Sequence, residues 1–136
     1  MSASQNLSYA AIQVVHNLGA VAIVGGSVVA VSLPNHAARK RLAQLVLFGW
    51  VTQATSGISF GLVSYYYDHE LPDISGIASY ALGIKMVCAT VGILLLTAYL
   101  WRSNTWTQQR QTRTWILACV IAISAISAAA FLRWFA

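Results

Sequence analysis

A lysine stands near the middle of a long apolar run. Lys85 lies within residues 74–100, a segment that carries no other charged side chain. A lysine at the centre of a membrane-spanning helix costs about 2.5 to 17 kcal/mol, depending on the scale and on whether the amine reaches the interface. Such a residue persists where it faces a protein interior, a water pocket or a partner. The sequence therefore predicts a membrane protein with a polar site inside it.

A histidine in another apolar run lies at a similar depth. His16 and Lys85 are at comparable distances from the outer ends of their predicted helices. Gln13 is one helical turn from His16 and lies on nearly the same face. Gln53, in the second apolar run, lies somewhat deeper. We therefore expect an intramembrane polar cluster of His16, Lys85, Gln13 and Gln53 in the outer half of the membrane.

Three interpretations of His16 stay open at this point. A neutral imidazole can hydrogen-bond a neighbouring helix, a contact worth about 0.6 kcal/mol. Imidazole also suits copper and iron, and Cys88 and Met86 offer soft sulfur for Cu(I); these two residues do not share a helix face, however, because they are two positions apart. In the third interpretation, His16 and Lys85 together hold a charged head group or a quinone carbonyl.

The connection at residues 67–73 is a second candidate for metal binding. It holds all three acids of the chain beside His69. Carboxylates and imidazole accept copper, zinc or calcium according to geometry, and the alternative is a solvated acidic turn. The candidate metal ligands are His16, His69 and Cys88, with copper as the favoured ion. Haem is less favoured, because a bis-histidine site needs two histidines in one gap and only His16 lies within an apolar run.

The composition defines the class of protein. Of the 136 residues, 58% are hydrophobic and 8% are charged, whereas a soluble domain has about 25% charged residues. Each apolar run exceeds the roughly 20 residues that cross a hydrocarbon core of about 30 Å. We predict an all-α integral membrane four-helix bundle, one transmembrane domain over residues 1–136. Its spans are approximately residues 7–31, 42–66, 74–100 and 114–134.

The distribution of charge predicts the orientation. Basic residues gather in or beside the first and third connections, and the acids lie in the second. The positive-inside rule then places both termini and the acidic connection on the outer, periplasmic side of a bacterial inner membrane. The net charge of +5 therefore indicates contact with a lipid bilayer and not with nucleic acid. Arg39, Lys40 and Arg41 are expected to bind anionic lipid head groups, at about 1 kcal/mol each.

Small residues indicate close helix packing. The second apolar run contains Gly57 and Gly61 in a GxxxG pattern, which lets two backbones approach closely in lipid. Such a pattern supports contacts inside the bundle, in a homo-oligomer, or with another subunit of a larger complex.

The order of several motifs along the chain is distinctive. A histidine is followed by a glycine pair, then by a proline and a basic stretch, a Ser-Gly step, and a lysine in a Leu-x-x-Lys setting. These motifs are His16, Gly25 and Gly26, Pro34, Arg39 to Arg41, Ser56 and Gly57, and Leu82 to Lys85. Over about residues 10–100 this order resembles the four-helix unit of the copper resistance protein D family. The resemblance implies a copper-handling role, with His16 on the path.

No motif for catalysis occurs in the sequence. It contains no HExxH, P-loop or CxxC pattern and no Ser-His-Asp set, so we expect the chain not to be an enzyme. Two functions stay open. The chain handles copper or another metal or redox ligand in the membrane, or it is a non-catalytic accessory subunit of a respiratory, photosynthetic or metal-oxidase membrane complex.

Overall fold

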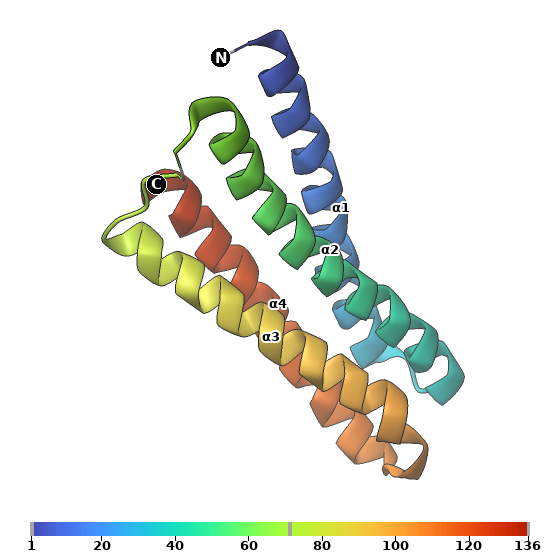
Figure 1. Ribbon diagram of the computed structural model, residues 1–136. Helices are drawn as coiled ribbons and strands as arrows, with labels where there is room; N and C mark the ends of the chain where they lie inside the picture. Colours follow the sequence, from blue (N-terminus) through green and yellow to red (C-terminus); the bar gives the residue numbers. More distant parts are fainter. Residues whose placement is uncertain (1, 71, 136) are drawn as a thin grey trace.

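Four long helices make up nearly all of the protein. The computed structural model describes residues 2–70 and 72–135. Within them a short 3-10 turn, η1, precedes the last helix, and no strand occurs. The elements are α1 (Ala3–Ser32), α2 (His36–Asp68), α3 (Ile77–Arg102), η1 (Ser103–Thr105) and α4 (Gln108–Phe135) (Figure 1).

Each of the four helices is long and apolar enough to cross a membrane. The shortest, α3, has 26 residues, which is about 39 Å at 1.5 Å per residue. This confirms the prediction of an all-α bundle with four candidate spans. The side of the membrane on which the termini lie stays a prediction.

Helix α2 begins earlier than its apolar run. Asn35 caps it, and the Asn35 side chain accepts hydrogen bonds from the backbone amides of Ala37 and Ala38. The helix therefore includes His36 and the basic residues 39–41. A hydropathy pattern registers only the apolar stretch, whereas a helix continues until its backbone is capped.

The helices form two antiparallel hairpins. Helix α1 packs mainly against α2, and α3 packs mainly against α4. The N-terminal end of α1 and the C-terminal end of α4 lie at the same end of the bundle as the α2–α3 connection (Figure 1). The α1–α2 and α3–α4 connections lie at the opposite end, which we call the inner end after the predicted topology.

Glycines allow the helices to approach at particular points. A Cβ on Gly92 of α3 would lie 2.4 Å from Cε2 of Trp50 on α2, so the Trp50 indole occupies the space that a side chain at position 92 would need. A Cβ on Gly49 would lie 3.0 Å from the Gly19 carbonyl oxygen. By contrast, positions 57 and 61 have nothing within 4 Å. The predicted GxxxG pair therefore makes no contact within the described bundle.

One predicted lipid contact is wrong. Arg39 is 2% exposed and cannot reach a head group. Its Nε donates to the Ala30 carbonyl oxygen at 3.0 Å, and its Nη2 donates to Val31 O at 3.3 Å and to Thr112 Oγ1 at 3.0 Å. The guanidinium lies at the carbonyl end of α1, where a cation is favourable, and links that end to α4. Lys40 is half-buried and Arg41 is exposed, so their lipid contacts stay a prediction.

Further polar contacts join the hairpins at the inner end. The two ring nitrogens of His36 lie 2.9 Å from Gln111 Oε1 and 3.0 Å from Asn104 Oδ1. The Tyr99 hydroxyl donates to the same Gln111 oxygen at 3.0 Å. With Arg39, these residues form an inner clamp between the α1–α2 hairpin and the α3–α4 hairpin.

Candidate functional site

The structure brings His16 and Lys85 together. The Lys85 amine on α3 lies 2.9 Å from Nε2 of His16 on α1. The contact joins the two hairpins at a point 69 positions apart in the chain. Both side chains are half-buried. An amine and an imidazole thus share one site in the interior of the candidate spans.

Ser56 of α2 is the second partner of His16. Its Oγ lies 2.7 Å from Nδ1 of His16 and donates to the backbone oxygen of Thr52 at 2.5 Å. A hydroxyl has one hydrogen to donate. Since Thr52 O is the nearest acceptor of that hydrogen, we infer that Nδ1 of His16 carries the hydrogen in the bond to Ser56. Nε2 then carries the lone pair and accepts from Lys85.

Gln53 supports the site from α2 through the backbone. Its side chain is buried, and its Nε2 donates to the backbone oxygen of His16. This bond fixes α1 against α2 at the level of the imidazole. Gln53 therefore positions the turn that carries His16.

Gln13 is not part of the cluster, contrary to the prediction. Its side chain is exposed and donates to Asn17 Oδ1 at 2.7 Å. Three positions along a helix correspond to a rotation of about 300°, so Gln13 and His16 differ by about 60° around the α1 axis. This difference turns Gln13 out of the bundle, where Asn17, one turn away, is the nearest polar partner.

Aromatic and apolar groups surround the site. The Phe60 ring approaches the His16 ring edge-on, with centroids 5.8 Å apart. A shallow groove between α1 and α2 reaches Ser56 from the outside of the bundle. Its lining residues are Ala11, Ile12, Val15, Thr55, Ser56 and Ser59.

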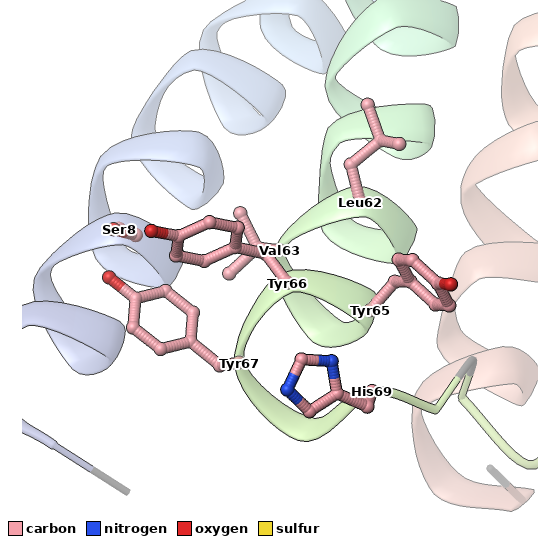
Figure 2. A pocket seen from close by; sticks show the side chains of 7 residues that line it. All are labelled: Ser8, Leu62, Val63, Tyr65, Tyr66, Tyr67 and His69. Atoms are coloured by element: carbon pink, nitrogen blue, oxygen red, sulfur yellow. The ribbon is translucent and has the colours of Figure 1, made fainter.

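The structure places His69 far from His16. His69 caps the end of α2 with a positive φ of 56°, about 20 Å along that helix from Ser56 at 1.5 Å per residue. It lies beside Tyr65 and Tyr67 in an open pocket at the outer end of the hairpin (Figure 2). Cys88 packs against the apolar core. The described residues contain no group of three or more His, Cys, Asp or Glu side chains arranged to hold a metal ion.

Sequence reasoning found His16 and Lys85 but missed Ser56 as their partner. Ser56 entered only as part of a Ser-Gly step. Serines are frequent in membrane helices, where their hydroxyls often bond back to the preceding turn. The signal that could have found it is its place one turn after Gln53 on α2.

No protein-family model, curated protein or solved structure matches this chain. The resemblance to the copper resistance protein D family therefore stays an expectation, and the geometry of the site carries the functional argument.

Proposed function

We propose that this chain is a small multi-pass membrane protein that binds a small ligand within the membrane at the Lys85–His16 pair. The observation that carries the proposal is the 2.9 Å contact between the Lys85 amine and His16 Nε2. Ionisable side chains inside a membrane protein mark ligand or ion sites by default, because their burial is costly. In this proposal the chain is not an enzyme, and it lies in a bacterial inner membrane with both termini outside.

Copper is the ligand that the family resemblance supports. A metal needs the lone pair of an imidazole nitrogen. At His16, Lys85 already occupies Nε2, and Nδ1 bears the hydrogen donated to Ser56. A bound cation would also be repelled by a charged amine close to it. The geometry therefore supports a ligand that accepts a hydrogen bond from Lys85 better than it supports a metal.

The test is to identify what the purified protein carries. Full-length protein in mild detergent is analysed by optical spectroscopy, metal analysis and mass spectrometry of extracted small molecules. We expect an extracted organic molecule that is lost in His16→Ala and Lys85→Met and kept in Arg113→Gln, whose side chain is exposed. Copper near one per chain that depends on His16 supports the copper alternative, and a Soret band supports haem. Ligand content that is equal in all variants contradicts the proposal.

A specific observation favours a second function, that of an accessory subunit. Gly57 and Gly61 have open space around them, although this spacing is typical of close helix contact in membranes. In this alternative, a helix of another subunit packs on this open face of α2. That subunit is a second copy of the chain or a member of a larger respiratory, photosynthetic or metal-oxidase complex.

Co-purification tests the accessory-subunit alternative. Replacing both Gly57 and Gly61 by Leu adds bulk on the open face of α2, so a partner that packs there is lost while the bundle stays folded. Gly83→Leu is the matched control, because Gly83 on α3 also has nothing within 4 Å. A partner kept in all variants argues against this interface.

A further inference from the structure

The amine of Lys85 has donor capacity that the protein does not use. An ammonium group carries three N–H donors. Among residues 2–70 and 72–135, His16 is its one hydrogen-bond partner. Two donor directions therefore remain for a group outside the chain.

In the described part of the chain, no acidic side chain lies at the depth of Lys85. All three acids of the chain lie between positions 68 and 73. Lys85 lies about 12 Å along α3 beyond Ile77, the first residue of that helix, at 1.5 Å per residue. The Asp68 carboxylate is already engaged, since both of its oxygens accept from Nε2 of Gln5. Charges inside proteins are normally paired, and here the counter-charge has to come from outside the chain.

The imidazole cannot provide that counter-charge, but it orients the amine. With the Nδ1 hydrogen donated to Ser56, the His16 ring is neutral and accepts at Nε2. Through this bond one N–H of the Lys85 amine points to His16 of α1. The other two N–H groups of the amine point away from the imidazole. His16 is thus a positioning residue for the Lys85 amine.

The surroundings of Lys85 are apolar. Ile84 and Met86 flank it on α3 and are 52% and 63% exposed. In a bilayer these side chains face acyl chains. A ligand that reaches Lys85 from this side has to combine an acceptor group with an apolar body.

We propose that Lys85, oriented by His16, binds the anionic head group of a single-chain amphiphile, with the acyl tail in the lipid along Ile84. The head group is a carboxylate or a phosphate monoester, both of which offer charged oxygen acceptors to an ammonium group. This inference rests on the proposed function and names the ligand class of the same site.

Binding of defined probes tests the inference. The full chain is placed in nanodiscs of phosphatidylcholine and titrated with carboxyl-¹³C oleate, followed by ¹³C NMR. Oleoyl phosphate is tested as a competitor, and oleyl alcohol is the uncharged control. We expect saturable oleate binding that Lys85→Met weakens roughly 10- to 100-fold, the range for one hydrogen bond to a charged group. Lys85→Arg keeps the charge and retains most of the affinity, and the exposed Arg113→Gln has no effect.

The two sources of the head group give different results. Binding of oleate without competition by oleoyl phosphate indicates a free fatty acid, and tighter binding of oleoyl phosphate indicates a lipid phosphate; both support the inference. Equal oleate binding by wild type and Lys85→Met overturns it, provided that thermal melts show both proteins folded. The inference is also overturned if the wild type binds oleyl alcohol as tightly as oleate.

Separate probes distinguish failure of the inference from failure of the proposed function. A short-chain ubiquinone analogue and Cu²⁺ are titrated under the same conditions. If one of them binds in a manner that needs His16 and Lys85 while oleate and oleoyl phosphate do not, the ligand class is wrong and the site stands. If no probe depends on either residue, both proposals are wrong.

Discussion

A hydrogen bond has a direction, and three consecutive bonds determine what His16 can bind. Ser56 donates to Thr52, His16 donates to Ser56, and Lys85 donates to His16. The chain of donors starts at the amine and ends at a backbone oxygen. At the scale of single residues, the site therefore offers N–H groups to a ligand and no free imidazole lone pair.

The tautomer of His16 is a direct consequence of this order. We expect the hydrogen on Nδ1, which ¹⁵N NMR of labelled protein distinguishes from a hydrogen on Nε2. His36→Gln and His69→Gln assign the signal, since the chain has three histidines. In Ser56→Ala the acceptor for Nδ1–H is gone, but Lys85 still donates to Nε2, so the hydrogen should stay on Nδ1 with a shifted ¹⁵N signal. An Nε2–H tautomer in the wild type contradicts the proposed order of donors.

Arg39 contributes to the stability of the fold, whereas the sequence predicted that it binds lipid head groups. Arg39→Ala leaves Ala30 O, Val31 O and Thr112 Oγ1 without its donors, and unsatisfied buried acceptors cost about 1–3 kcal/mol. We expect a loss in the free energy of unfolding at the lower end of this range. The reason is that Arg39 Nη1 is already buried without a partner in the described part of the chain.

Denaturant titration in detergent, followed by tryptophan fluorescence, measures this loss. Arg41→Ala is the matched control, because Arg41 is exposed and exposed substitutions usually change the free energy of unfolding by less than about 0.5 kcal/mol. Equal stability of the two variants would show that the inner clamp does not depend on Arg39.

At the scale of helices, the contact between the hairpins depends on small residues at selected positions. Gly92 of α3 receives the Trp50 ring of α2, whereas Gly83 of the same helix faces open space. Lipid provides no hydrophobic drive between helices, so van der Waals packing at such points supplies much of the association. The two glycines thus have different roles although their sequence setting is similar.

Alanine substitution separates the two roles. In Gly92→Ala the new Cβ would lie 2.4 Å from Trp50 Cε2, so we expect overpacking to lower the free energy of unfolding by about 1–3 kcal/mol. Gly83→Ala meets no atom within 4 Å and should be neutral, or stabilising by up to about 1 kcal/mol through helix propensity. Thermal melts in detergent compare the two variants. A lower melting temperature for Gly83→Ala than for Gly92→Ala would contradict this packing.

At the scale of the whole molecule, two hairpins are joined by an inner clamp and by the Lys85–His16 contact. The clamp and the contact lie at different levels of the bundle, so the ligand site is not needed to hold the inner ends together. Substitutions at Lys85 should therefore leave the fold intact, which makes the binding experiments interpretable. The orientation of the molecule is predicted from the charges of its connections.

Cysteine labelling tests the orientation. In a background with Cys88→Ala and Cys119→Ala, single cysteines are introduced by Ser2→Cys, Asp73→Cys or Asn104→Cys. With both termini outside, an impermeant maleimide should label positions 2 and 73 in intact cells. It should label position 104 only after permeabilisation. The reverse pattern would place the basic connections outside and contradict the charge rule.

Much of the fold could be predicted because hydropathy and depth are linear properties of the chain. Each residue adds 1.5 Å along a helix, so the similar depth of His16 and Lys85 followed from counting positions. Counting positions did not predict which side of each helix faces the bundle and which faces outward. Gln13 faces outward and Arg39 faces inward, although each position suggested the opposite, and the Gly57–Gly61 face is open.

The sequence alone determined that the chain has four candidate membrane-spanning helices and that an amine and an imidazole occur at one level among them. Only the tertiary structure decided that these two groups touch, that Ser56 contacts the imidazole, and that His69 lies far from them. The physical reason is that the rotation of each helix about its axis depends on how side chains of different helices fit together. That fit involves residues far apart in the chain, which no local pattern of hydropathy or charge specifies.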